Sequence, residues 1–178
     1  MRVVGVDPSL TGTGVACATR HQDGSVSWES FTVKSKASAP SIAARMKRLS
    51  WIKRSALARL TPGALMVIEA PAYSRSQGSR HERSGLWWLI VDLATEKGSR
   101  AVEVSPTARA KYATGRGNAS KAEVVAAVSA RYGVSPANDN EADAIALAAL
   151  GFRLAGFPIE ATSEPWMDEV AATVRGEL

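Results

Sequence analysis

Three acidic residues in this sequence lie where carboxylates could act together. Asp7 follows the run RVVGV, Glu69 follows the apolar run ALMVI, and Asp143 lies in the segment NDNEADAIALAA. A carboxylate at the end of a buried strand is costly without a partner, and like charges at short range require a cation. Mg²⁺ suits such a site because it takes few protein oxygens and leaves positions for water and phosphate. The three acids therefore indicate a candidate two-metal phosphodiesterase site.

Two of these acids have a structural alternative. Asp7 could cap the turn after its strand through the backbone of Ser9 or Thr11. Glu69 could pair with an arginine across the sheet. Either contact would satisfy the carboxylate without a metal, so position in the sequence alone does not assign the chemistry.

The segment NDNEADAIALAA divides its acids between different roles. Asn138 and Glu141 are three residues apart, the spacing of a capping box, so the start of a helix explains Glu141. Alanines surround Asp143 and would let this helix approach a sheet closely, which would bring Asp143 to the strand ends. Asn140 and Asp139 lie one helical turn earlier and share its face. Either of them could complete the site.

The order of predicted elements indicates an α/β fold with a mixed sheet flanked by helices. β-branched runs bounded by turn clusters indicate strands, and apolar residues at helical spacing indicate helices. The first three strands should be antiparallel because tight turns join them, and the polar segment 73–85 should be a loop. The predicted strands are 2–7, 15–19, 25–33, 64–69 and 100–104. The predicted helices are 41–60, 86–98, 120–132 and 138–155, and Ser105 and Pro106 mark the start of a further helix.

Composition indicates one domain without a membrane span. The chain has 178 residues, of which 46% are hydrophobic, and its single cysteine, Cys17, cannot form an internal disulfide. No apolar run approaches the roughly 18 residues that a transmembrane helix needs. We therefore expect a soluble cytoplasmic protein with one domain over residues 1–156 and an acidic tail over residues 157–178, and no membrane partner.

The charge is unevenly distributed. Residues 1–156 carry 21 basic and 12 acidic side chains, and eight Lys or Arg with no acid lie between Glu29 and Glu69. Such blocks of one sign favour a polyanion as partner, most commonly nucleic acid, over a merely solvated helix face.

Three segments resemble motifs of the RuvC-type Holliday-junction resolvases. GVDPSLTGTGVA is similar to the first strand and turn of this family, VIEAP to its second acidic motif, and EADAIALA to its final helix. They occur in the family's order. The resemblance implies an RNase H-like fold with a five-stranded mixed sheet, a homodimer, and nicking of branched DNA with Mg²⁺ as cofactor and Mn²⁺ as a substitute.

The resemblance also implies a set of metal ligands. Asp7, Glu69 and Asp143 match the family's acidic positions and would be catalytic. The fourth liganding position, where the family has an acid or a histidine, is Asn140 in this sequence. We expect Asn140 to hold this place, with Asp139 as a substitute, because an amide oxygen binds Mg²⁺ more weakly than a carboxylate does.

Basic and aromatic residues complete the expected DNA-binding surface. Lys111 and Lys121 fall where the family has catalytic basic residues near the scissile phosphate. Lys121 should also lie in the first turn of a helix, where the dipole disfavours a cation unless an anion is near. Tyr73 follows the family's wedge position and could stack on a base at the branch point, or simply pack on the surface. The other expected DNA contacts are Arg75, Arg80, Arg83 and Arg116.

Two adjacent tryptophans, Trp87 and Trp88, lie in a helix so apolar that it must be buried in the core or in a partner. The resemblance places them in the dimer interface, where tryptophan is enriched. Burial in the core is the alternative.

The sequence thus predicts a metal-dependent endonuclease acting on four-way junctions and related branched DNA. Two alternatives stay open: a branched-DNA-binding module without catalysis, suggested by Asn140, and an RNA-processing nuclease of the same fold. An actin-like ATPase or sugar kinase is disfavoured because the sequence contains no second Gly-rich phosphate motif.

Overall fold

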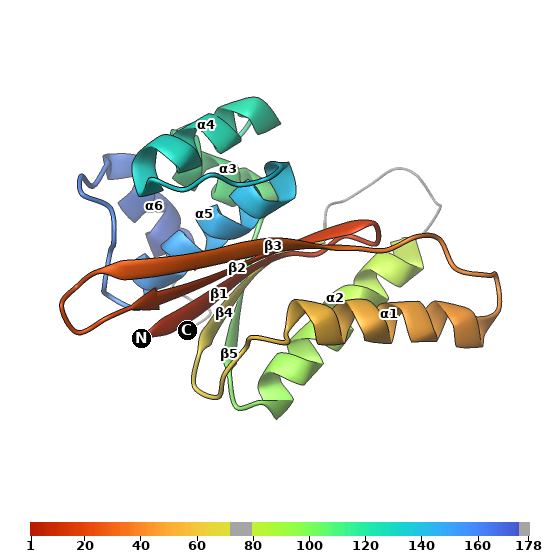
Figure 1. The fold of residues 1–178 in the computed structure, drawn as a ribbon. Coiled ribbons are helices and arrows are strands. Elements are labelled where there is room, and N and C mark those ends of the chain that lie inside the picture. Colours follow the sequence, from red (N-terminus) through yellow and green to blue (C-terminus); the bar gives the residue numbers. More distant parts are fainter. Residues whose placement is uncertain (72–79, 175–178) are drawn as a thin grey trace.

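A five-stranded mixed sheet forms the centre of the computed structural model, which describes residues 1–71 and 80–174 (Figure 1). The strands are β1 (Arg2–Asp7), β2 (Gly12–Arg20), β3 (Val26–Lys34), β4 (Leu65–Glu69) and β5 (Arg100–Val104). Their order in the sheet is β3-β2-β1-β4-β5. β1, β2 and β3 are antiparallel neighbours, whereas β4 pairs parallel with both β1 and β5. The predicted mixed sheet is therefore confirmed.

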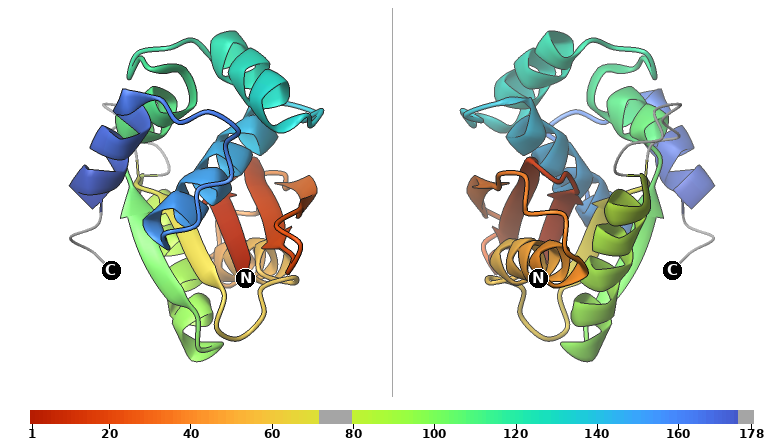
Figure 2. Two further views of the ribbon diagram at one scale, coloured as in Figure 1. Left: turned by 90° about the vertical axis from the view of Figure 1, so that its left-hand side faces the viewer. Right: turned by 90° about the vertical axis from the view of Figure 1, so that its right-hand side faces the viewer.

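Helices cover both faces of this sheet. They are α1 (Ile42–Ala56), α2 (Arg80–Glu96), α3 (Pro106–Thr114), α4 (Lys121–Tyr132), α5 (Asp139–Leu154) and α6 (Pro165–Val174). α1 and α2 lie on one face and the other four on the opposite face, as the two side views show (Figure 2). Over residues 1–71 and 80–174, no helix is both long and apolar enough to cross a membrane.

Alternation along β1 and β4 directs both strand-end acids to one face of the sheet. Val3 of β1 and Val67 of β4 belong to the core on the α5 side, whereas their neighbours Val4 and Met66 belong to the core beneath α1 and α2. Successive strand residues point to opposite faces, so Asp7 and Glu69 point to the α5 side. Because Val6 pairs with Ile68 in parallel register, these two acids end neighbouring strands at the same edge.

Close packing of α5 on the sheet brings Asp143 to this edge. A Cβ on Gly5 would lie 2.0 Å from the Ala144 carbonyl oxygen, and one on Gly14 would lie 2.0 Å from the Asn140 carbonyl oxygen. Only glycine, which has no Cβ, allows the helix to come this close, because a real Cβ essentially never lies within 3.0 Å of a heavy atom elsewhere in the chain. The alanine-rich helix therefore lies directly on β1 and β2, as its sequence predicted.

Two elements differ from the sequence prediction. The expected loop over residues 73–85 is wrong for residues 80–85, which form the first turns of α2. This extension is stabilised by the ion pair between Arg45 Nε of α1 and Glu82 Oε1, 2.6 Å apart. The second difference is α6, a helix in the segment that the sequence prediction describes only as an acidic tail. Its residues Met167, Val170 and Val174 recur at helical spacing and are buried.

The acidic C-terminal segment is fastened to the body by a buried arginine. Arg153 of α5 is 4% exposed and donates at 2.7 Å to both Glu160 and Asp168. It also donates to the hydroxyl of Tyr112 in α3. These bonds hold the segment that leads into α6 against α3 and α5.

Candidate functional site

The acids from three elements meet at the carboxyl ends of β1 and β4. Asp7 contributes from β1, Glu69 from β4 and Asp143 from α5, and each carboxylate lies within the electrostatic influence of the others. The three acids thus lie near one another, as the sequence predicts, and their role as metal ligands stays a prediction. The turn after β1 does not use Asp7 as a cap: Ser9 and Thr13 hold it, with the Thr13 hydroxyl donating to the Ser9 carbonyl at 2.7 Å.

An arginine from α3 bridges two of these acids. Arg109 Nε donates to Glu69 Oε2 at 2.6 Å, and its Nη1 donates to Asp143 Oδ1. The exposed fractions of the side chains are 12% for Arg109, 12% for Glu69 and 8% for Asp143. The alternative in which Glu69 pairs with an arginine is thus realised, but by a helix rather than by a neighbouring strand.

Burial and crowding raise the affinity of two carboxylates for protons. The pKa of Asp7 is raised to about 8, first by burial and then by the charges of Glu69 and Asp143. The pKa of Asp143 is raised to about 6, again mainly by burial, although Arg109 opposes this shift. Ionising all the acids together is therefore unfavourable unless a further cation balances them.

A second ion pair lies beside the acids at the start of α5. Lys121, the first residue of α4, bonds to the carboxylate of Asp139, and this hydrogen bond raises the pKa of Lys121 and lowers that of Asp139. The charge of Lys121 also acts on Asp7 and Asp143. The anion expected near this first-turn lysine is therefore present.

Asn140 has different surroundings from Asp139. The amide nitrogen of Asn140 lies 3.1 Å from the position of a Cβ on Gly12, on the β2 side of the cluster. Its side chain lines a cavity of about 660 Å³ together with Lys34 and Lys36. The two candidates for the fourth ligand thus face different neighbours.

Glu141 has a structural role. Its carboxylate accepts hydrogen bonds from Ser30 at 2.9 Å and from Thr32 at 3.1 Å, both on β3, and from the backbone of Ala137. The Asn138 side chain caps α5 by accepting from the Glu141 backbone. Glu141 therefore anchors the start of α5 to β3.

The predicted DNA contacts differ in their distance from the acids. Arg80 and Arg83 line a cavity of about 130 Å³ together with Pro8 and Glu69, next to the acids. Arg116, on the loop between α3 and α4, pairs with Glu123 and stays 62% exposed. Two further predicted contacts, Tyr73 and Arg75, lie outside the described residues.

Lys111 is directed away from the acids. Its Nζ lies 2.7 Å from Glu169 Oε2 of α6, and its side chain borders a cavity between α3 and α6. The structure therefore brings Lys121, but not Lys111, beside the acid cluster.

The two tryptophans of α2 differ in exposure. Trp87 is 8% exposed and donates to the Glu69 carbonyl oxygen at 3.0 Å, which fixes the end of β4. Trp88 is 66% exposed. Trp87 is therefore a core residue, whereas the exposed side chain of Trp88 is accessible to a partner.

Oxygen donors suited to a divalent cation are present, but they are not arranged as a ready cage. Carboxylates are the ligands that Mg²⁺ prefers, and the raised pKa of Asp7 marks a carboxylate that is buried beside two others. In the part of the chain that the structure describes, however, no three acid, histidine or cysteine side chains converge closely enough to hold a metal. Arg109 already bridges Glu69 and Asp143.

Sequence reasoning did not find Arg109. The segment SPTARAKYAT shows a helix start, and its position after β5 places that start near the carboxyl end of a strand beside β4. Nothing in the segment distinguishes the face that carries Arg109 from the face that carries Lys111.

The fold and the acids at its edge define a class of structure: an RNase H-like mixed sheet with carboxylates at the ends of β1 and β4. RuvC of Thermus thermophilus has this fold, with a TM-score of 0.68 and 22% identity over 90% of this chain and 99% of RuvC. T. thermophilus RuvC in complex with a Holliday junction substrate matches at the same TM-score and 20% identity, with the same coverage. The yeast mitochondrial Holliday junction resolvase Ydc2 matches at TM-score 0.57 and 11% identity, over 98% of this chain and 81% of Ydc2.

These similarities confirm the predicted RNase H-like fold of the RuvC type. No protein-family model matches the sequence, and comparison with curated proteins finds no match.

Proposed function

We propose that this protein is a RuvC-type resolvase, a Mg²⁺-dependent endonuclease that nicks branched DNA such as Holliday junctions. The observation that carries this proposal is the meeting of Asp7, Glu69 and Asp143 at one sheet edge, on a fold that spans nearly all of RuvC. The acids would hold Mg²⁺, with Mn²⁺ as an alternative cofactor. The metal would supply activation of the attacking water and stabilisation of the leaving oxygen.

Different residues would hold the metal and bind the phosphate. Asp7, Glu69 and Asp143 would hold the metal, and Asp139, whose charge acts on Asp143, would join them in preference to Asn140 because a carboxylate binds Mg²⁺ more strongly than an amide. Lys121, released from Asp139, would then be close enough to bind the scissile phosphate.

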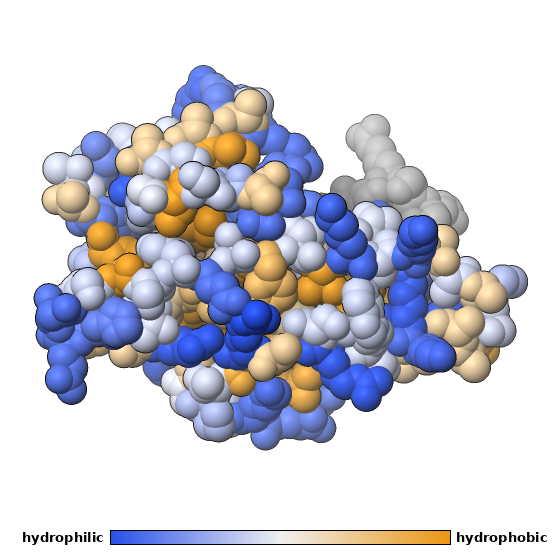
Figure 3. All heavy atoms as spheres, viewed as in Figure 1, coloured by the Kyte–Doolittle hydropathy of each residue, from blue (hydrophilic) through white to orange (hydrophobic). Residues whose placement is uncertain are grey.

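Basic side chains on both sides of the acids support a bound DNA strand. Arg83 presents a buried Nη2 with no hydrogen-bond acceptor among the described residues, and a phosphate oxygen would supply one. On the other side, Lys34 and Lys36 border the cavity beside Asn140. Hydrophilic side chains also spread over β3 and α1 on the face in Figure 3. Binding should therefore weaken steeply with salt.

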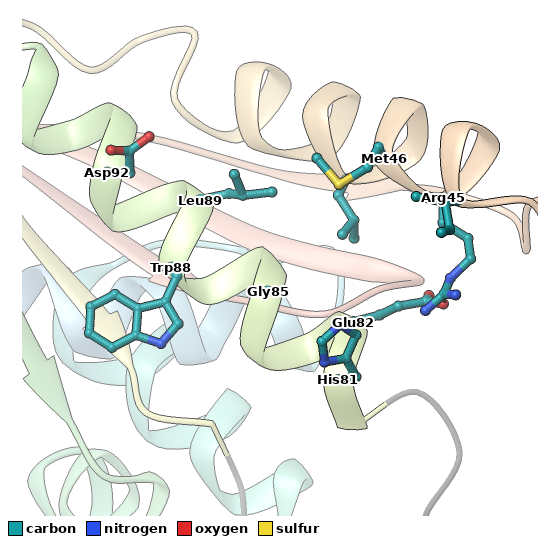
Figure 4. A pocket seen from close by; sticks show the side chains of 10 residues that line it. Arg45, Met46, His81, Glu82, Gly85, Trp88, Leu89 and Asp92 are labelled. Atoms are coloured by element: carbon teal, nitrogen blue, oxygen red, sulfur yellow. The ribbon is translucent and has the colours of Figure 1, made fainter.

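We further propose that the protein acts as a homodimer through α1 and α2. These helices enclose a groove of about 690 Å³ lined by Ile42, Met46, Trp88 and Leu89 among others (Figure 4). Ile42 is 76% exposed and Met46 is 45% exposed. A second copy of the chain would cover this apolar surface, and resolving a four-way junction requires two nicks.

A cleavage panel tests the proposal. Labelled four-way junctions, flaps, forks, linear duplexes and structured RNA would be incubated with wild type and Asp7→Asn in Mg²⁺, in Mn²⁺ and in EDTA. We expect metal-dependent nicks in branched DNA by wild type only. Cleavage that persists in Asp7→Asn would refute the site, and preferential cutting of RNA would favour an RNA-processing nuclease.

One observation favours a second function, a branched-DNA-binding module without catalysis. Arg109 bridges two of the three acids and would exclude a metal if it could not move. Junction binding in EDTA, without cleavage in either metal, would identify this function.

A further inference from the structure

Arg109 occupies a position between two acids that a cation would otherwise take. Its guanidinium, carried by α3, bonds to Glu69 of β4 and Asp143 of α5 at the same time. The three side chains are exposed by 12% or less, so water screens their charges poorly. The attraction of Arg109 to each carboxylate is therefore strong. Removing the guanidinium would leave two buried carboxylates facing each other.

Asp7, the third acid, accepts no hydrogen bond from any described residue. Its carboxylate lies beside Glu69 and Asp143. Among the described residues, Arg109 is bonded to two of the three carboxylates, and Asp7 feels Arg109 and Lys121 only through their charges. The cluster still has room for positive charge, and a divalent cation between the acids would compete with the bonds of Arg109.

We propose that Arg109 is a positioning residue that holds Glu69 and Asp143 together while no metal is bound, and that it must release at least one of them when a divalent cation binds. This inference rests on the metal-binding part of the proposed function. Arg109 then stabilises the metal-free protein and lowers its affinity for metal, because the cation must displace the guanidinium.

Metal binding and unfolding measurements on Arg109→Gln test this role. Free Mn²⁺ would be followed by electron paramagnetic resonance during a titration, and thermal unfolding would be measured in EDTA and in Mn²⁺. We expect Arg109→Gln to unfold at a lower temperature in EDTA, to bind Mn²⁺ about tenfold more tightly than wild type, and to gain more stability from Mn²⁺. Equal or weaker Mn²⁺ binding by Arg109→Gln would overturn the proposal.

A matched control tests whether the expected changes come from losing the counter-ion of the acids or from losing any arginine that bonds to α3. Arg131 of α4 donates through Nη1 to the Ala113 carbonyl at 2.8 Å, and it forms no ion pair with an acid among residues 1–71 and 80–174. Arg131→Gln should lower the unfolding temperature equally in EDTA and in Mn²⁺ and leave Mn²⁺ affinity unchanged. Tighter Mn²⁺ binding in this variant as well would contradict a specific role for Arg109.

Two further variants keep the test decisive if Arg109→Gln does not fold. Arg109→Lys keeps the charge but has a shorter side chain without the rigid fork of the guanidinium, so it should hold the two carboxylates less firmly and bind Mn²⁺ with intermediate affinity. Arg109→Gln combined with Glu69→Gln removes one repelling charge and should regain stability in EDTA. If Arg109→Lys binds Mn²⁺ no more tightly than wild type, or the double variant regains none, the role is refuted.

None of these measurements depends on cleavage, so the two proposals fail separately. A protein that shows the expected Mn²⁺ competition but cuts no nucleic acid would refute the nuclease and leave the role of Arg109 intact. Metal-dependent cleavage by wild type, together with unchanged Mn²⁺ affinity in Arg109→Gln, would do the reverse.

Discussion

Arg109 and Lys111 lie two residues apart on α3 and form ion pairs on opposite sides of that helix. Arg109 bonds to Glu69 and Asp143 in the acid cluster, whereas Lys111 bonds to Glu169 of α6. Two residues turn an α-helix by about 200°, which explains how one short helix serves both sites. A role for Lys111 in binding phosphate would therefore require it to leave Glu169.

The Lys111–Glu169 pair should weaken DNA binding. Lys111 is 39% exposed and Glu169 is 63% exposed, so the pair contributes at most about 1 kcal/mol. We expect Glu169→Gln to tighten binding to a four-way junction by about two- to fivefold in EDTA, as measured by fluorescence anisotropy. Glu164→Gln removes the same charge from this segment without freeing Lys111, and it should have the smaller effect. Equal effects of the two variants would attribute the change to net charge alone.

The metal-free protein should lose stability as pH rises. Asp7 has a pKa of about 8 in the folded state and an ordinary value near 3.8 when unfolded. Between about pH 4 and 8 the folded state retains a proton that the unfolded state has lost, so the free energy of unfolding falls over this range. Asp143 adds to the fall between about pH 4 and 6, because its pKa is about 6.

Replacing the acid should remove most of this pH dependence. Since one unit of pKa shift corresponds to about 1.36 kcal/mol, the shift of about four units sets an upper limit of about 6 kcal/mol, and Asp7→Asn should be more stable than wild type by at least about 2 kcal/mol at pH 8 in EDTA. Urea unfolding at several pH values measures this difference. A wild-type stability that stays constant or rises between pH 5 and 8 would contradict the predicted burial of Asp7.

Asp139 and Asn140 should differ in their effect on metal affinity. Asp139 is paired with Lys121 close to Asp143, whereas the Asn140 amide lies beside Gly12. We expect Asp139→Ala to weaken Mn²⁺ binding by about tenfold, a loss typical of a residue that supports a metal centre, and Asn140→Ala to change it much less. Calorimetric titration gives both affinities, and the opposite order would restore Asn140 to the fourth ligand position.

The contact between α5 and β1 should tolerate no side chain at Gly5. A methyl group there would collide with the Ala144 carbonyl, and overpacking of this kind costs about 1–3 kcal/mol or more. Gly85→Ala is the matched control, because its new methyl group would have no atom nearer than 3.9 Å and would favour the helix by up to about 1 kcal/mol. Urea unfolding of both variants measures the difference, and a neutral Gly5→Ala would show that α5 lies farther from the sheet.

The exposed tryptophan of α2 should control dimerisation. Trp88→Glu places a charge in the proposed interface and is expected to give a monomer by light scattering coupled to gel filtration. Trp51→Glu changes a tryptophan of α1 that is 48% exposed and does not line the groove, and it should leave the dimer intact. A Trp88→Glu dimer would move the interface elsewhere on the surface.

Local patterns accounted for much of the fold and for part of the site. The apolar runs of β1 and β4 predicted two buried strands with Asp7 and Glu69 at their ends, because a short apolar run depends on adjacent residues only. The cap at Asn138 and the alanines around Asp143 likewise depend on adjacent residues only. These features determined that three carboxylates would meet.

Only the tertiary structure decided what surrounds those carboxylates. Periodicity places Arg109 and Lys111 on opposite sides of α3, but the packing of α3 between the sheet edge and α6 decides which of them reaches the acids. In the same way, the approach of β3 gives Glu141 its hydroxyl partners, and the packing of α2 against β4 buries Trp87 and leaves Trp88 exposed. Such contacts join residues far apart in the chain, and their energies depend on distances that no local pattern contains.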